Sequence, residues 1–285
     1  MGNIRDIKSR IDSITNTRQI TNAMKMVAAA KLRKAQNGII KARPYADNIN
    51  RMLATVKYKS KETDQRIFVQ PKPGTKTALV VVTADRGLCG SFNSFVIKAA
   101  IQYLKDNPNT DLFCIGKKGY DIFKKRDVKM LKSYTGLFNE MNFSVSTEIA
   151  SDLNQQFFQK EYDQVEVIYN EFKSIMQQDV IHKQVLPIPD SEEMEGVSLL
   201  DFIYEPGEEE VIEELSNKYI NVEIWRILLE SSAAEQGARM TAMDSATDNA
   251  TDMIQSLTLQ YNMVRQAAIT NEIIEIASGA EAQNQ

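Results

Sequence analysis

The segment Thr83–Asn93, TADRGLCGSFN, is the first place in the sequence where the residue types suggest a ligand. It follows the apolar run Ala78–Val82 and precedes residues with helical spacing. A glycine-containing loop between a strand and a helix can hold an anion at the helix N-terminus. The same glycines equally favour a tight turn, with Ser91 as the N-cap of the helix. Because the sequence has no Walker A segment and no GxGxxG, we expect the structural role. A nucleotide- or phosphate-binding enzyme is the alternative.

The cysteines and the histidine exclude several common site classes. The sequence has 2 Cys, Cys89 and Cys114, whose spacing forms no CxxC pair and no disulfide scaffold. We expect both to be buried thiols that pack as small apolar side chains. The 1 His, His182, lies near apolar residues, so we expect a structural role for it. A Ser-His triad or a histidine zinc site is not expected.

Three carboxylates, Asp244, Asp248 and Asp252, repeat every four residues near the C-terminus and share one helix face. Such a row can suggest a cation site. Like charges at this spacing cost a few tenths of a kcal/mol each, and a basic helix facing them would relieve that cost. We therefore expect no metal site here. For the chain as a whole we expect no metal, no cofactor and no catalytic residue.

The two ends of the chain carry opposite charge. Residues 1–59 hold 13 Lys and Arg against 3 Asp and Glu, a net charge of +10, and residues 205–285 hold 4 against 15, a net charge of −11. Antiparallel pairing of the two ends would neutralise both. A basic helix can also bind nucleic acid, but no aromatic residue precedes Tyr45. We expect no nucleic-acid partner.

The N-terminal segment has the spacing of a coiled-coil helix. Apolar residues recur three and four apart at Ile4, Ile7, Ile11 and Ile14. Polar residues then stand where apolar ones are due, at Arg18, Thr21 and Lys25. We expect the seam to change phase there, to Ile20, Met24 and Val27, which would locally alter the supercoil. Pro44 is expected to kink or end the helix.

The C-terminal segment, Glu208–Ala277, is predicted to be the longest helix, ending at Ser278-Gly279. Its seam is predicted at Met243, Ala246, Ala250, Met253, Leu257, Gln260, Val264, Ala267, Asn271 and Ile274. The two terminal helices would span about 84 and 105 Å, whereas a compact globule of this length has a radius of gyration near 19 Å, by the size scaling of folded chains. We therefore expect an antiparallel coiled-coil rod.

The central part alternates strand and helix patterns. Strands are predicted at 78–82, 112–115, 128–131, 165–169 and 180–187, and helices at 91–105, 119–125 and 146–159. The expected fold class is α/β: a long antiparallel coiled coil of the N- and C-terminal helices plus a small Rossmann-like parallel-sheet domain. The expected divisions are an N-terminal helix at 1–59, a globular domain at 75–205 and a C-terminal helix at 206–285.

The sequence contains no run of about 18 apolar residues, which excludes a membrane-spanning helix. The basic, amphipathic N-terminus can also suggest a targeting peptide. We favour the helix, because the periodicity begins at Ile4 and continues past Val27 without a cleavage-like break.

Three stretches, Arg10–Ala35, Thr83–Asn93 and Ala238–Ala282, resemble the gamma subunit of the F-type ATP synthase. Shorter matches lie at Val185–Pro189 and Tyr204–Pro206, so the resemblance extends over the whole chain. It implies a central-stalk rotor subunit, which is not itself an enzyme. Rotation of the membrane c-ring, driven by ion flow, would be coupled through it to conformational change at the beta-subunit catalytic sites. A static coiled-coil scaffold is a further alternative.

The resemblance also implies partners and contact residues. The coiled coil would lie inside the alpha and beta subunit hexamer, and the globular domain would bind the epsilon subunit and the c-ring. Met24 and Lys25 match the stretch near the beta lever, and the stretch Ile273–Ala280 would fill an apolar bearing. The full set of expected hexamer contacts is Met24, Lys25, Arg239, Arg265, Gln266, Thr270, Glu272, Ile273 and Ile276.

Two departures from the family pattern concern α-helical positions. Met263 stands where Lys or Arg is common, and Gly237 replaces a usual Ala, which loosens the helix by roughly 1 kcal/mol. The plastid dithiol insertion is absent. We expect a bacterial subunit, peripheral to the membrane through its complex, at the cytoplasmic face of the plasma membrane.

Overall fold

The computed structural model describes residues 4–59, 66–72, 74–139, 141–159, 161–189, 205 and 207–283. The chain divides into two compact units. The terminal unit combines Met1–Val27 with Met240–Gln285, and the sheet unit holds Ala28–Arg239. Helices α1 (Ile4–Lys59) and α5 (Glu208–Gln283) contribute residues to both units. The sequence-based division at 1–59, 75–205 and 206–285 stays a prediction.

A five-stranded sheet in the order β3-β2-β1-β4-β5 is the centre of the sheet unit. The strands are β1 (Thr77–Val82), β2 (Thr110–Ile115), β3 (Met130–Tyr134), β4 (Gln164–Phe172) and β5 (Gln178–Leu186). Strands β3, β2, β1 and β4 pair in parallel, and β5 pairs antiparallel with β4. Strand β1 is buried along its whole length, because its continuous apolar run suits a strand covered on both faces. The predicted α/β class is confirmed.

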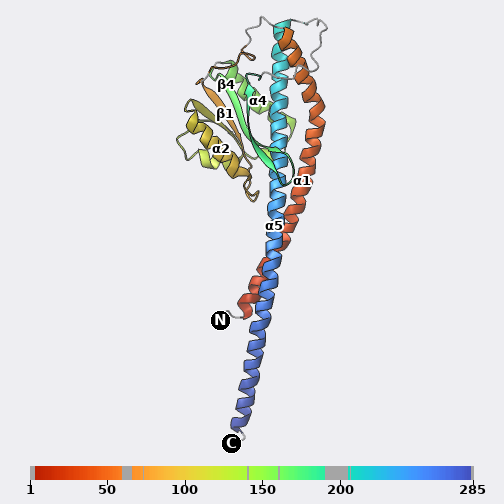
Figure 1. The fold of residues 1–285 in the computed structure, drawn as a ribbon, viewed down its shortest axis with the longest axis vertical. Helices are drawn as coiled ribbons and strands as arrows, with labels where there is room; N and C mark the ends of the chain where they lie inside the picture. Colours follow the sequence, from red (N-terminus) through yellow and green to blue (C-terminus); the bar gives the residue numbers. More distant parts are fainter. Residues whose placement is uncertain are drawn as a thin grey trace. The chain divides into compact units, whose positions relative to one another are not determined.

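Helices cover both faces of this sheet (Figure 1). Helices α2 (Phe92–Asp106) and α3 (Lys117–Phe123) pack against Leu79, Val81 and Leu112 on one face. Helix α4 (Phe143–Phe158) and parts of α1 and α5 share a larger apolar core with the other face. A 3₁₀ turn, η1, lies at Leu137–Asn139.

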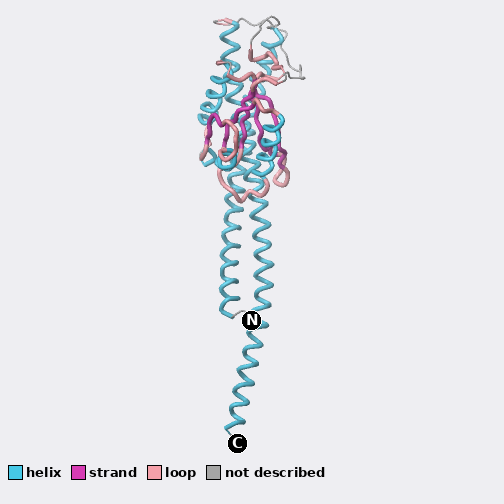
Figure 2. Tube along the Cα trace, turned by 90° about the vertical axis from the view of Figure 1, so that its left-hand side faces the viewer, coloured by secondary structure: helices cyan, strands magenta, loops and turns pink. Residues whose placement is uncertain are grey.

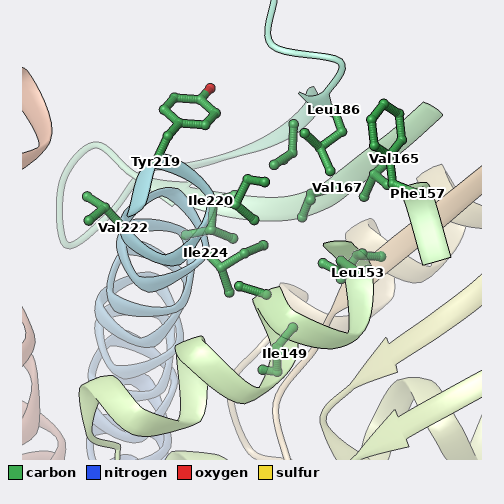
Figure 3. Close-up of a cluster of buried hydrophobic side chains, with 14 of the residues drawn as sticks. Ile149, Leu153, Phe157, Val165, Val167, Leu186, Tyr219, Ile220, Val222 and Ile224 are labelled. Carbon is green, nitrogen blue, oxygen red and sulfur yellow. The ribbon is translucent and has the colours of Figure 1, made fainter. Parts of the chain in front are cut away.

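The core on the α4 side joins three kinds of element. Figure 3 shows Leu153 and Phe157 of α4 beside Val165 and Val167 of β4, with Ile220 of α5 close by. All of these side chains are buried. Removing apolar surface from water contributes roughly 25 cal/mol per Å². This cluster is therefore a main source of the free energy that holds α5 against the sheet.

Segments of α1 and α5 run antiparallel within each unit. In the sheet unit, Leu32 and Ala35 pack with Ala233. A Cβ on Gly38 would lie 2.9 Å from Leu229 Cδ2, so the backbones approach closely there. In the terminal unit, Thr21 meets Thr247 and Lys25 meets Asp244. Rising numbers in α1 match falling numbers in α5, as the predicted antiparallel coiled coil requires.

Three predicted features of the elements are wrong. Pro44 lies inside α1, so the helix end expected there is wrong, whereas the alternative expectation of a kink at Pro44 stays a prediction. The helix continues because Ala46, Ile49 and Leu53 beyond Pro44 are buried in the core. Ser278-Gly279 does not end α5, which continues to Gln283 through residue types that favour helices. Strand β3 begins later than predicted, at Met130, because its polar Lys132 and Ser133 give an edge strand little apolar signal.

Candidate functional site

The paired helices of the terminal unit meet through a polar seam. Thr21 Oγ1 lies 2.7 Å from Thr247 Oγ1. One turn further along α1, the Lys25 ammonium donates to the Asp244 carboxylate. Thr21 is 8% exposed, whereas the Lys25 and Asp244 side chains are 37% and 49% exposed. The hydroxyl pair is therefore the buried part of the seam, and the ion pair lies at its edge.

The predicted change of phase in α1 is wrong. The seam stays in phase through Thr21, which is buried, whereas Ile20 and Val27 are 60% and 57% exposed. The polar residue is accepted in the seam because Thr247 of the facing helix supplies a hydrogen-bond partner. Met24 is half-buried. Apolar spacing alone did not reveal this arrangement, since the partner lies more than 200 residues away in the sequence.

The last part of α5 presents most of the predicted contact residues to solvent. Figure 2 shows α1 and α5 side by side in the terminal unit, with α5 continuing past the N-terminus of α1. The residues predicted from the resemblance are exposed there: Arg265, Gln266, Thr270, Glu272, Ile273 and Ile276. Thr270 Oγ1 donates to its own helix, to the Gln266 carbonyl at 2.9 Å. The exposed side chains of Arg265, Gln266 and Glu272 can contact a partner.

Large apolar side chains are also exposed along this part of α5. Ile273 is 60% exposed and Ile276 is 72% exposed. Ile274, in the stretch predicted to fill an apolar bearing, is exposed as well, and so are four apolar residues that the contact prediction did not include: Met253, Leu259, Met263 and Ile269. The predicted seam holds only in part over this length, since Leu257 and Val264 in it are half-buried, whereas Met253 and Ile274 are exposed. A helix with apolar residues on more than one side is typically enclosed by other chains or elements.

Arg239 is placed differently from the other predicted contacts. It is 9% exposed, and its guanidinium donates to Glu235 Oε1 at 2.5 Å and to the Gly87 carbonyl at 3.2 Å. Burial raises the pKa of Glu235, and the Arg239 charge only partly offsets this. Arg239 therefore joins α5 to the loop after β1 within the sheet unit, and its contact with a hexamer stays a prediction.

The loop Thr83–Asn93 uses its polar groups internally. The Asp85 carboxylate accepts hydrogen bonds from the backbone N–H groups of Lys117 and Gly136, at 3.0 and 2.9 Å. Asn93 Oδ1 accepts from the Ala84 N–H at 2.9 Å. Ser91 stands at the N-cap of α2, but its side chain makes no capping hydrogen bond. These contacts give the loop the structural role expected of it.

The remaining sequence candidates also have structural settings. Cys89 and Cys114 are buried, as predicted. Burial raises the pKa of the Cys114 thiol to about 12, so it stays protonated at neutral pH. His182 Nε2 lies 2.7 Å from Glu166 Oε2, and its ring packs edge-on against Tyr103. Asp244, one of the three carboxylates in the row on α5, forms an ion pair with Lys25.

The described helices include none that is long and apolar enough to cross a bilayer. In the terminal unit, the geometry presents a pair of helices with a polar seam, extended by a single helix with exposed apolar and polar side chains.

The sequence matches one protein family over almost its whole length. A family model described as ATP synthase matches residues 3–283. The ATP synthase gamma chain of Salinibacter ruber is 45% identical, with 99% of this chain and 98% of that protein covered. The gamma chain of Prosthecochloris aestuarii is 44% identical, with 99% of each covered.

The fold also matches chains in solved structures of ATP synthases. A chain in the central stalk and c-ring structure of the Tetrahymena thermophila mitochondrial ATP synthase is 29% identical, with a TM-score of 0.65 over 80% of this chain and 99% of that chain. A chain of the Euglena gracilis enzyme, 19% identical with a TM-score of 0.68 over 98% of this chain and 94% of that chain, shares the fold. The chain therefore belongs to the family of ATP synthase gamma chains.

Proposed function

We propose that this chain is the central-stalk rotor of an F-type ATP synthase. It couples ion-driven rotation of a membrane c-ring to conformational change at the catalytic sites of beta subunits. The chain itself carries no catalytic residue in this proposal. Its partners are the alpha and beta subunits, the epsilon subunit and the c-ring, and the complex lies at the cytoplasmic face of a bacterial plasma membrane.

The observation that carries this proposal is the exposed end of α5. Ile269, Ile273 and Ile276 repeat at spacings of four and three on one face, and Ile274 is exposed beside them. Burial of each such side chain contributes about 1.5–3 kcal/mol. A surrounding sleeve of other subunits would supply that burial, and Arg265 and Gln266 would supply polar contacts.

The polar seam supports a stiff element. In the terminal unit, the Thr21–Thr247 and Lys25–Asp244 contacts fix which residues of the two helices face each other. Polar pairs in an otherwise apolar seam favour one register over its neighbours. A rotor needs such a fixed register, because slip between its helices would dissipate torque.

The first test is purification of the tagged chain from detergent-solubilised membranes of its own cell. We expect alpha, beta and epsilon subunits to be recovered with ATPase activity. The double variant Ile273→Asp/Ile276→Asp should weaken retention of alpha and beta by at least about tenfold, because two apolar burials are replaced by desolvated charges. Lys98→Ala, an exposed position on α2, is the matched control and should recover the same subunits as the unaltered chain.

Three outcomes would overturn the proposal. Recovery of the chain without alpha and beta subunits would contradict the rotor assignment. Saturable nucleotide binding by the chain alone, with a stoichiometry near one, would favour the α/β enzyme alternative through the Thr83–Asn93 loop. A complex that hydrolyses ATP without rotation of this chain would leave the static scaffold as the better account.

A further inference from the structure

A partly buried network of charged and polar groups lies between α5 and the sheet. Within α5, the Arg226 guanidinium donates to Glu223 Oε1 and to Glu230 Oε1, each at 2.7 Å. Glu223 and Glu230 are 4% and 8% exposed. The Arg226 side chain, which is 28% exposed, therefore joins two buried carboxylates along one side of the helix.

Two bonds of this network cross from the helix to the sheet. Lys183 Nζ of β5 donates to Glu223 Oε1 at 2.7 Å. The Tyr169 hydroxyl of β4 donates to Glu230 Oε2 at 3.1 Å. In the antiparallel ladder Tyr169 faces Ile181 and Val167 faces Lys183, so Tyr169 and Lys183 lie on the same face of the sheet.

The spacing of the two attachments matters mechanically. Glu223 and Glu230 are seven residues apart, which is about two turns or 10.5 Å along a helix. A single attachment point would let the helix pivot about it. Two points, separated along the axis and joined by Arg226, oppose both sliding along the axis and rolling about it. Directional charge-assisted hydrogen bonds oppose such motions better than apolar contacts, which are similar for neighbouring orientations.

Stability alone does not explain this network. Well-packed apolar side chains of similar volume commonly stabilise a protein as well as a buried ionic cluster does, because the charges need not be desolvated. The surrounding core is already apolar, with Ile220, Ile224 and Ile227 on the same helix buried. What the ionic groups add is a defined orientation of the helix.

We propose that Tyr169, Lys183, Glu223, Arg226 and Glu230 form a torsional clamp that passes torque between the sheet and α5. This inference rests on the proposed rotor function and names the residues through which the rotor would carry load. The five residues are positioning residues that act through the orientation of α5. The clamp sets the angular stiffness between the sheet and α5.

The test uses an immobilised assembly of alpha and beta subunits with this chain and measures angular fluctuations of an attached bead during pauses. The bead is attached through Lys98→Cys on α2 or through Lys218→Cys on α5, both exposed positions. The natural Cys89 and Cys114 are buried and do not compete for the label. A bead on α2 reports motion across the clamp, whereas a bead on α5 bypasses it.

The main variant replaces the clamp by apolar groups of similar size: Tyr169→Phe, Lys183→Met, Glu223→Leu, Arg226→Met and Glu230→Leu together. We expect its thermal stability to equal or exceed that of the unaltered chain. The variance of the bead angle should rise roughly twofold with the bead on α2, because the directional attachments are gone, and should stay unchanged with the bead on α5. Should this variant fail to assemble, Lys183→Met/Glu223→Gln removes one crossing bond and keeps the Arg226–Glu230 pair.

The outcomes separate the two proposals. An unaltered chain that does not assemble or rotate overturns the rotor function, and the clamp with it. If the altered chain rotates and its angular variance equals that of the unaltered chain at each bead position, the clamp alone is overturned. An equal increase at both bead positions also overturns it, because the added motion would then lie outside the contact between the sheet and α5.

Discussion

The hydroxyl of Thr21 in α1 lies 2.7 Å from the hydroxyl of Thr247 in α5. Each hydroxyl also lies within reach of its own helix, since Thr21 can donate to the Arg18 carbonyl at 3.1 Å and Thr247 to the Met243 carbonyl at 2.8 Å. Each hydroxyl has one proton, so one threonine donates across the seam and the other donates to its own helix. The pair is therefore satisfied in either direction of donation.

Valine substitution tests this pairing while it keeps the side-chain shape. Thr21→Val alone should cost about 1 kcal/mol, because Thr247 loses its cross-helix partner in a buried seam. The double variant Thr21→Val/Thr247→Val should be close to neutral, since replacing both partners by apolar groups leaves neither hydroxyl unsatisfied. A double-mutant cycle on thermal unfolding measures the difference. Additive single effects would contradict a direct interaction.

The seam also shows where sequence reasoning stopped. The spacing of the isoleucines in residues 4–14 predicts the seam correctly as far as Ile14, because every seam position there holds an apolar residue. From Arg18 onward the seam contains polar residues whose partners, such as Thr247, lie at the other end of the chain. Local periodicity contains no information on a hydrogen bond to a distant segment, so the apolar pattern alone predicts a phase change that the structure does not have.

The sheet was easier to predict than the candidate site. The continuous apolar runs of β1 and β2 are unambiguous, and their order with the intervening helices implies a parallel sheet. The contact residues near Arg265 came from the resemblance to a family. The exposed Ile269 gave no separate signal, because on a long amphipathic helix an apolar residue is ordinarily expected to face the seam. The crossing bonds of Glu223 and Glu230 depend on strand register, which a sequence pattern does not give.

The carboxyl of Glu230 predicts a distinct pH dependence. Burial raises its pKa, although Arg226 and the Tyr169 hydroxyl favour the charged form, and Glu171 and Glu223 add to the increase. A carboxyl whose pKa is raised by folding destabilises the native state when ionised, and this penalty disappears as the pH falls below its folded pKa. Glu230→Gln should therefore raise the melting temperature at pH 8, and the gain should shrink toward pH 5.

The matched control for that prediction is Glu214→Gln. Glu214 is exposed on the same helix and pairs with Lys218, whose hydrogen bond lowers the pKa of Glu214. Its contribution has the opposite sign, so this variant should gain nothing at pH 8. Melting temperatures from pH 5 to pH 8 distinguish the two variants. An equal gain for both at pH 8 would point to net charge rather than to burial of Glu230.

Gly116, between β2 and α3, is predicted to be intolerant of any side chain. Its φ is +93°, and a Cβ there would lie 1.9 Å from the Thr83 carbonyl oxygen, which belongs to the backbone. Gly116→Ala should destabilise the sheet unit by more than about 3 kcal/mol, since left-handed strain is added to a clash that cannot relax. Gly136, with φ of +82° and no atom within 4 Å of the added Cβ, is the control. Gly136→Ala should cost only about 1–2 kcal/mol, the strain alone. Urea unfolding of both variants measures the difference, and equal losses would show that the contact with Thr83 does not matter.

Exchanging the charges of the Lys25–Asp244 ion pair tests whether Lys25 acts only within the seam or also contacts a partner subunit. Lys25→Asp places two carboxylates together and should cost the terminal unit up to about 1 kcal/mol, because both side chains are partly exposed and screened. The exchanged pair Lys25→Asp/Asp244→Lys should restore the melting temperature, since it rebuilds the ion pair in the opposite direction. If Lys25 also contacts a beta subunit, as the family resemblance implies, the exchanged pair should remain poorly coupled. The ratio of coupling ions transported to ATP hydrolysed, measured in reconstituted vesicles, distinguishes the two roles. Full recovery of that ratio together with the melting temperature would confine Lys25 to the seam.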